Sequence, residues 1–340
     1  MATPLGQKQP TPEVVFETLN AHQKTAALKA AIELEIFTAI AEGATSASTI
    51  ARRCRASERG IRTLCDYLTI QNFLTKTAGN YGLSPVSATF LDKRSPAYLG
   101  SIAGFLTSPL AIDRYRNLTE VVRKGGALED DQGTSEADNP MWIEFARSMA
   151  AMQFPSGEAI AAMVKADAGE KWKVLDIAAG HGVFGIAIAK HNPNSQIYAA
   201  DWPAVLAVAM ENAKNANVAN RFHTIPGSAF DVDFGSGYDL VLLTNFLHHF
   251  DAPTNEKLLR KIHAAMNPKG QLVTLEFVPN EDRVSPPIPA QFSLTMLAGT
   301  RAGDAYTFAE FDQMLNNTGF SSNKLLPMPL GPQSVIISQK

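Results

Sequence analysis

The chain has 340 residues, a mass of 36.7 kDa and a formal net charge of −3, which suits two domains or one large core with an appended helical unit. Its 45% hydrophobic and 19% charged residues exclude an intrinsically disordered chain. A pI near 6.2 argues against a surface built as a whole for nucleic acid or anionic lipid.

Cysteine content and apolar runs bear on where the protein works. Cys54 and Cys65 are too few for a disulfide framework or a four-thiolate zinc site, so we interpret them as buried thiols of a cytoplasmic protein. The N-terminus has no basic region followed by an apolar stretch, and no apolar run reaches about 18 residues. We therefore expect neither a secretory signal nor a membrane span.

Residues 1–100 are expected to form a helical domain. Residues 1–11 predict a loose tail, and residues 12–40 carry apolar side chains every third or fourth position, which predicts one long helix. Residues 45–91 predict a helix, a turn, a second helix and a β-hairpin turning at Gly79 and Asn80. This order of elements is typical of a winged helix.

Residues 101–340 are expected to form a second, α/β domain. It begins with a predicted helix over 101–124, an acidic surface loop over 128–139, and a helix that opens at Pro140 and breaks at Pro155. After Lys171, strands and helices alternate, which specifies a doubly wound, mainly parallel sheet. Strand-like pieces on either side of Gly331 and Pro332 predict an antiparallel C-terminal hairpin.

A glycine loop joins the first strand and first helix of this second domain. Gly180, Gly182 and Gly185 satisfy the dinucleotide fingerprint, and Asp201 follows about 20 residues later. Glycines let the backbone turn tightly against a ligand, and a carboxylate after the second strand can accept ribose hydroxyl hydrogen bonds. Asp176 would repel a pyrophosphate but suits a cationic sulfonium or an amino group, which favours S-adenosylmethionine over NAD. The remaining alternative is a structural turn with no ligand.

The sequence resembles the class I S-adenosylmethionine-dependent O-methyltransferases. The resemblance is carried by DIAAGHG at 176–182, Asp201 followed by Pro203, NFLHHF at 245–250 and the terminal hairpin. The closer match is the homodimeric branch with an N-terminal winged-helix dimerisation domain, which includes caffeic acid, acetylserotonin and bacterial polyketide O-methyltransferases. It covers the chain from about residue 12 to the end, and it implies a homodimer that methylates a small aromatic acceptor.

The resemblance also implies where the cofactor binds. Asp176, Gly180 and Gly182 would line its methionine part, and Asp201 would hold its ribose. A stretch at 228–230 stands where the family often has Asp-Met-Phe beside the adenine, and its first residue departs from that pattern. The full cofactor set that we expect is Asp176, Gly180, Gly182, Asp201, Ser228, Ala229, Phe230, Asn245 and Met149.

His248 is the expected general base. A phenol with a pKa of about 10 is mostly protonated at neutral pH, so a base within hydrogen-bond reach assists its attack. His248 follows the fourth strand, at the edge of the sheet where ligands of open α/β folds bind. The family motif Leu-His-Asp-Trp maps its base onto His248, whereas His249 replaces the aspartate and receives no role.

Glu276 lies inside an otherwise apolar strand. Burying a carboxylate costs free energy unless it is paired, and its spacing from His248 matches the family's glutamate that orients the base. The alternative is a structural hydrogen bond to backbone. The family's second supporting glutamate falls on Ala305, so Asp304 substitutes, Glu276 acts alone, or proton abstraction matters less. Because of this departure a second interpretation stays open, in which the chain is a member of the family that keeps the cofactor and performs non-methylating chemistry.

The acceptor pocket is expected to be apolar and rich in sulfur. Its residues come from segments 101–110, 145–154 and 289–304, and we expect Phe145, Phe292 and Met296 to bind the acceptor. For Phe145 and Met149, plain core packing at i and i+4 is the alternative. Such a pocket suits a flat aromatic or polyketide hydroxyl. Metal-assisted methylation would need a cluster of hard oxygen ligands, which the sequence does not supply, and we expect no metal.

Two interpretations compete for the N-terminal domain. Residues 44–94 hold eight basic residues against three acidic ones, a local charge of +5, and a basic helix-turn-helix is what a DNA-binding regulator shows. The rest of the chain carries −8, and in the resembling family this domain serves dimerisation. We therefore expect no nucleic-acid partner and a homodimer in which the helices over 12–40 and 101–124 interleave with a second copy.

Overall fold

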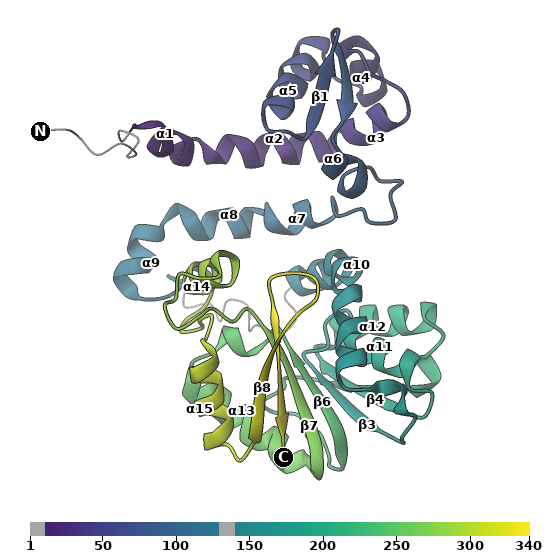
Figure 1. The fold of residues 1–340 in the computed structure, drawn as a ribbon, viewed down its shortest axis with the longest axis vertical. Helices are drawn as coiled ribbons and strands as arrows, with labels where there is room; N and C mark the ends of the chain where they lie inside the picture. Colours follow the sequence, from purple (N-terminus) through teal and green to yellow (C-terminus); the bar gives the residue numbers. More distant parts are fainter. Residues whose placement is uncertain (1–10, 129–139) are drawn as a thin grey trace, which may run out of the picture. The chain divides into compact units, whose positions relative to one another are not determined.

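The computed structural model describes residues 11–128 and 140–340, which fall into two compact units, Met1–Ser108 and Pro109–Lys340 (Figure 1). The predicted tail and the predicted acidic loop lie outside the described residues except at their last and first positions, Thr11 and Leu128.

The first unit opens with three helices where the sequence predicted one. They are α1 (Glu13–Leu19), α2 (Ala21–Glu33) and α3 (Ile36–Ala41). The break before α3 falls at Glu35, whose φ of 56° is left-handed and interrupts the helical hydrogen-bond ladder. The prediction of one continuous helix was therefore wrong, although the apolar spacing that prompted it is present.

A winged helix follows, as predicted. Helices α4 (Ala47–Cys54) and α5 (Glu58–Ile70) begin at Ser46 and Ser57, whose side chains cap the first turn. Strands β1 (Leu74–Thr77) and β2 (Asn80–Leu83) form an antiparallel hairpin, and α6 (Pro85–Phe90) and α7 (Ile102–Leu106) complete the unit. Its core is built on buried Phe37, Ile50, Ile61 and Leu68.

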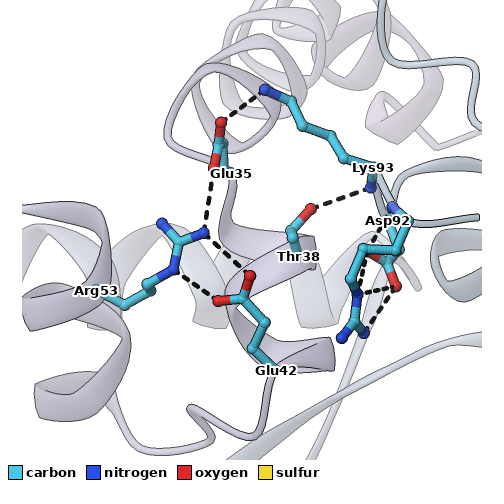
Figure 2. A network of polar contacts seen from close by, with 7 residues as sticks. Glu35, Thr38, Glu42, Arg53, Asp92 and Lys93 are labelled. Carbon is cyan, nitrogen blue, oxygen red and sulfur yellow. Dashed lines mark hydrogen bonds and ion pairs between the residues drawn. The ribbon is translucent and has the colours of Figure 1, made fainter.

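Acidic side chains neutralise much of the basic character of this unit. Arg53 Nε lies 2.6 Å from the Glu42 carboxylate and Arg53 Nη2 lies 3.3 Å from Glu35, which also binds Lys93 at 2.6 Å (Figure 2). Asp92 holds the neighbouring Arg94 at 3.0 Å. The left-handed turn at Glu35 thus lies in a network that joins α3, α4 and the segment after α6.

The second unit is built on a seven-stranded sheet in the order β5-β4-β3-β6-β7-β9-β8. Its strands are β3 (Lys173–Ile177), β4 (Gln196–Asp201), β5 (Phe222–Pro226), β6 (Tyr238–Thr244), β7 (Met266–Glu276), β8 (Ser321–Pro327) and β9 (Ser334–Gln339). Strands β3 to β7 are parallel, whereas β9 runs antiparallel to β7 and β8. This confirms the predicted doubly wound sheet with a C-terminal hairpin.

Helices cover both faces of the sheet (Figure 1). One face packs against α10 (Pro140–Met163), α11 (Val183–His191) and α12 (Pro203–Asn215), and the other against α13 (Ala252–Ala265) and α15 (Phe308–Asn317). The remaining helices are α8 (Pro109–Arg116), α9 (Leu118–Lys124) and α14 (Pro287–Gly299), and α14 contacts both α8 and α9. Alternate residues of β6 serve two cores, with Leu240 and Leu242 against α10 to α12 and Val241 and Leu243 on the face of α13 and α15.

Two helix predictions between residues 101 and 299 were wrong, and one helix was missed. The predicted helix over 101–124 is divided into α7, α8 and α9, with Pro109 opening α8 and Gly125 ending α9 in a left-handed conformation. Helix α10 continues through Pro155 instead of breaking there, because its buried residues beyond the proline pack on α11. Helix α14 was not predicted.

Two further properties can be read from the described residues. Cys65 is buried and Cys54 half-buried, and both are free thiols. Within the described ranges, no helix is both long and apolar enough to cross a bilayer.

Candidate active site

A cavity lies where the strand order reverses, between β3 and β6, at the carboxyl ends of the strands. Open α/β sheets bind ligands at this position. The walls are formed by Trp142, Phe145, Gln153, Ala178, Ala179, Gly180, His181, Phe184, Ala200, Asp201, Trp202, Val205, Gly227, Ser228, Ala229, Phe230, Thr244, Asn245, Phe246, His249 and Phe250. All of these belong to the second unit.

The glycine loop after β3 forms one wall. Gly180 and Gly182 have φ values of 57° and 73°, which favour glycine. A Cβ at Gly182 would lie 2.9 Å from Ala209 Cβ, and one at Gly185 would lie 2.7 Å from Ile197 Cγ2. The first and third glycines therefore differ in role: Gly180 faces the cavity, whereas Gly185 allows α11 to approach the sheet.

Asp201 ends β4 at the cavity and is fixed by backbone donors. Its Oδ2 accepts from Gly180 N–H at 2.8 Å, and its Oδ1 accepts from Trp202 N–H at 2.7 Å. Burial raises the pKa of Asp201 to about 6, and these two hydrogen bonds oppose the rise. One carboxylate thus joins the glycine loop to the end of the neighbouring strand, at the position expected for ribose binding.

Asp176 lies behind the glycine loop and outside the cavity lining. It is fully buried, its Oδ2 accepts from Gly185 N–H at 3.0 Å, and its Oδ1 has no hydrogen-bond partner among the described residues. Burial, reinforced by the charge of Asp201, raises the pKa of Asp176 to about 8. Gly182, the loop residue next to His181, also falls outside the lining.

Aromatic rings close the end of the cavity formed by segments 228–230 and 245–250. Ser228, Ala229 and Phe230 all line it, as the expected adenine site requires. The Phe230 and Phe250 ring centroids are 5.0 Å apart, edge to face, and those of Phe246 and Phe250 are 5.1 Å apart. A flat heterocycle fits among such rings.

Asn245 lies at the exit of β6 with a left-handed φ of 55°. Its Oδ1 accepts a hydrogen bond from Gln333 Nε2, so the terminal hairpin supports the cavity wall. With that oxygen engaged, the Asn245 side chain offers its NH₂ group to a ligand.

His248 and Glu276 form a buried pair beside this cavity. His248 Nδ1 lies 2.5 Å from Glu276 Oε2, and the two side chains are 6% and 1% exposed. Glu276 Oε1 accepts from the N–H groups of Phe246 and Leu247, each at 2.9 Å. The Glu276 carboxylate therefore binds both the histidine and the backbone, which the sequence left as alternatives. With Nδ1–H donating to Glu276, the neutral ring keeps its lone pair on Nε2.

His249 lies beside His248 but faces the cavity. The two ring centroids are 4.3 Å apart, and Trp142 meets His249 edge to face at 5.8 Å. Burial, followed by the charge of His248, lowers the pKa of His249 well below its ordinary value, so this ring stays neutral.

The expected acceptor residues occupy different places. Phe292 on α14 meets the His248 ring edge to face at 4.9 Å, and Met296, one turn later on α14, is buried. Phe145 lines the cavity, whereas Met149 is partly buried on the same helix and outside the lining. The structure thus brings His248 and Phe292 together, on the side of the two histidines where α14 lies.

The position of the family's second glutamate is filled by a fully buried Ala305. Asp304 pairs with Arg283 at 3.0 Å, and no interaction between Asp304 and His248 occurs within the described residues. A Cβ at Gly303 would collide with the His248 carbonyl oxygen. This loop therefore supports the histidine pair through backbone contact.

Several residues that line the cavity were not predicted from the sequence. His181 Nδ1 accepts from Val183 N–H at 3.3 Å, and burial lowers the pKa of His181 to about 4. Its place in DIAAGHG was the signal that could have found it. Gln153, Trp142, Trp202, Phe246 and Phe250 also line the cavity, and no local motif singles out Gln153.

The cavity suits S-adenosylmethionine. Its features are a glycine loop, a carboxylate at the ribose position, an aromatic end and an unpaired buried amide oxygen on Gln153. No lysine or arginine of the described ranges lines it, which leaves it open to a cation. Among the described residues, no group of three His, Cys, Asp or Glu side chains is arranged to hold a metal ion.

Family models match both units of the chain. Residues 115–321 match an O-methyltransferase domain, and residues 16–93 match an O-methyltransferase dimerisation domain. A 3-hydroxy-5-methyl-1-naphthoate 3-O-methyltransferase from Streptomyces sahachiroi is 28% identical over 316 residues, covering 91% of this chain and 90% of the relative. The tetracenomycin polyketide synthesis 8-O-methyl transferase TcmO from Streptomyces glaucescens is 25% identical and covers 97% of both chains.

Solved structures agree with these matches. A Nostoc punctiforme protein solved as a candidate O-methyltransferase is 50% identical, with a TM-score of 0.95 over 98% of this chain and 100% of that chain. Human N-acetylserotonin methyltransferase, in complex with S-adenosylmethionine, gives a TM-score of 0.84 at 20% identity over 99% of both chains, which shows a shared fold.

Proposed function

Because the chain belongs to the S-adenosylmethionine-dependent O-methyltransferase family, we propose that it methylates a hydroxyl of a small aromatic or polyketide-like acceptor. The buried His248–Glu276 pair carries the proposal, since Glu276 engages Nδ1 of His248 and leaves Nε2 of the ring for the acceptor's proton. Relatives named for naphthoate and tetracenomycin methylation support an aromatic polyketide acceptor.

His248 acts as the general base. Glu276 accepts the Nδ1 proton and holds the ring, so Nε2 removes the acceptor's hydroxyl proton as the new oxygen–carbon bond forms. The Glu276 carboxylate then stabilises the imidazolium that results. Glu276 Oε1 fixes the loop that carries the base through its two backbone donors.

Asp201, Gly180 and the 228–230 stretch bind the cofactor, with Asn245 offering its side-chain NH₂ group. S-adenosylmethionine supplies an electrophilic methyl group on a sulfonium. The carboxyl group of Asp176 acts from behind the loop, where its Oδ2 accepts the Gly185 N–H at 3.0 Å and holds the first turn of α11 in place. Gly182 gives the glycine loop its shape, and Met149 contacts the cofactor from α10.

The acceptor lies against Phe292 and Met296 of α14, on the His248 side, with Phe145 between acceptor and cofactor. The Phe292 and His248 rings meet edge to face, and this arrangement favours an aromatic acceptor that stacks within hydrogen-bond distance of His248 Nε2. With Ala305 at the second position, Glu276 is the one carboxylate among the described residues that binds His248. The acceptor is therefore a hydroxyl acidic enough to need no second carboxylate.

The protein works as a homodimer of chains with a dimerisation domain at residues 1–100 and a catalytic domain at residues 101–340. The match to a dimerisation domain supports this. Helix α1 has no buried residue, and Val14, Val15, Phe16 and Leu19 are each more than half exposed. A second copy covers this apolar helix.

Ion pairs argue against the alternative of a DNA-binding regulator. Five of the eight basic side chains in residues 44–94 pair with carboxylates: Arg53, Arg62, Lys76, Lys93 and Arg94. A nucleic-acid surface would offer such groups to phosphates.

The test is transfer of labelled methyl from S-adenosylmethionine to a panel of phenols, naphthols and polyketide aromatics. We expect His248→Ala to lower transfer by about 10² to 10⁴-fold while calorimetry shows unchanged binding of S-adenosylhomocysteine. His223→Gln, on the exposed face of β5, is the control and should retain full activity. Equal transfer by wild type and His248→Ala would contradict the assigned base, and no cofactor binding by the wild type would contradict the function.

A further inference from the structure

Gln153 is a buried amide in the wall of the cofactor cavity. It is 7% exposed and lies on α10, on the same stripe as Phe145 and Gly157. One turn later, a Cβ at Gly157 would lie 3.1 Å from the Val183 carbonyl oxygen and 3.2 Å from Ala187 Cβ. Val183 is the first residue of α11 and directly follows the glycine loop. The close approach at Gly157 therefore places Gln153, one turn earlier on α10, next to that loop.

The amide oxygen of Gln153 lacks a hydrogen-bond partner among the described residues. This atom, Oε1, is fully enclosed. A buried amide oxygen without a donor is costly because it has given up its hydrogen bonds to water, and such groups are rare in folded proteins. It is also the one buried unpartnered side-chain oxygen that belongs to the cavity lining of the described residues. The site thus needs a donor from the ligand.

The donors of S-adenosylmethionine are its ribose hydroxyls, its adenine amino group and its α-amino group. Asp201 occupies the ribose position, and the aromatic end at 228–230 and 246–250 suits the adenine. The α10 wall beside the glycine loop is neither the ribose position nor the aromatic end. The α-amino group of the methionine part is the remaining donor, and it is a cation.

The charge of this wall suits a cation. His181, on the glycine loop, stays neutral because burial lowers its pKa to about 4. Of the residues that the structure describes, no lysine or arginine lines the cavity. A neutral carbonyl oxygen facing an ammonium gives a charge-assisted hydrogen bond, which is about twice as strong as a neutral one.

We propose that Gln153 binds the α-amino group of the methionine part of S-adenosylmethionine through its Oε1. This inference rests on the proposed function for the cofactor cavity but is independent of the acceptor and of the base. Gln153 acts in binding and holds the methionine chain against the glycine loop.

The experiment measures calorimetric binding of three probes to the full-length protein. S-adenosylhomocysteine has the amino and carboxylate groups, its decarboxylated analogue keeps only the amino group, and 5′-methylthioadenosine has neither. We expect Gln153→Leu to weaken the first two probes by about 10 to 100-fold and to leave 5′-methylthioadenosine unchanged. Gln153→Glu keeps an acceptor and should restore most of the lost affinity.

Two controls separate the possible outcomes. Asp201→Asn should weaken all three probes, and Phe154→Leu, at a 39% exposed position of α10, should weaken none. Loss confined to S-adenosylhomocysteine would assign Gln153 to the carboxylate and overturn the proposal. Equal losses for all three probes, or no loss, would also overturn it. A wild-type protein that binds none of the probes would instead refute the cofactor site.

Discussion

Replacing Glu276 by glutamine tests the base more sharply than removing His248. Glu276 Oε1 accepts two backbone N–H groups at 2.9 Å, and Oε2 accepts the His248 Nδ1 proton at 2.5 Å. A glutamine can satisfy both backbone donors only with its oxygen toward them. Its NH₂ group then faces His248, whose Nδ1 must become the acceptor.

The magnitude follows from this geometry. Turning the amide over would leave two buried N–H groups unpaired, at about 1–3 kcal/mol each, so the orientation with NH₂ toward His248 dominates. The neutral imidazole then carries its proton on Nε2 and cannot accept one from the acceptor. We expect kcat/KM to fall by about 10² to 10⁴-fold, with unfolding free energy lowered by about 2 kcal/mol through the lost charge-assisted bond.

The assay combines methyl transfer, urea unfolding and calorimetric binding of S-adenosylhomocysteine. Glu276→Ala is the comparison, because it leaves both backbone donors unpaired and should lower the unfolding free energy by about 2–6 kcal/mol. A Glu276→Gln protein that folds, binds the cofactor product and keeps transfer within tenfold of wild type would refute the tautomer argument.

Three further predictions concern other parts of the chain. Gly303→Ala should displace the His248 loop, because its Cβ would collide with the His248 carbonyl oxygen; turnover should fall while S-adenosylhomocysteine binding persists, and unchanged turnover would show that the loop yields freely. Asp176 holds its proton to about pH 8 in the folded protein but releases it near pH 4 when unfolded, so it contributes stability that is lost as pH rises through this range. Thermal unfolding of Asp176→Asn should therefore depend less on pH between 5 and 8 than that of wild type, and parallel curves would contradict the pKa. Phe16→Glu on exposed α1 should convert a dimer to a monomer in light scattering, whereas Glu17→Gln should not; a wild-type protein that is already monomeric would exclude the dimer.

The sequence predicted the architecture where local pattern and tertiary packing agree. The alternation after Lys171 predicted the parallel strands β3 to β7, because parallel strands buried on both faces read as short apolar runs, and the pieces around Gly331 predicted β8 and β9. Ser46 and Ser57 likewise mark the helix starts of the winged helix.

Predictions failed where packing overrides local preference. Pro155 removes one helical hydrogen bond, but the apolar face of α10 continues beyond it to Ile160 against α11, and that burial outweighs the loss. Glu35 adopts a left-handed conformation that no local signal marks, and its carboxylate binds Arg53 and Lys93, which are distant in sequence.

The candidate site divides in the same way. Residues at strand ends, such as Asp201 and His248, could be found because their spacing follows the strands. Gln153 could not be found, since its place in the cavity depends on how α10 crosses α11. Asp176 was predicted from its charge, but only the structure shows that it lies behind the loop.

The support of the base and the wall of the acceptor pocket come from separate parts of the fold. Glu276 ends β7 within the central sheet, whereas Phe292 lies on α14 outside it and meets His248 through a single ring edge. Within the described residues, the segment 287–299 makes none of the hydrogen bonds that hold His248 and Glu276. In the proposed function, the helix that contacts the acceptor is therefore separate from the strand that holds the base.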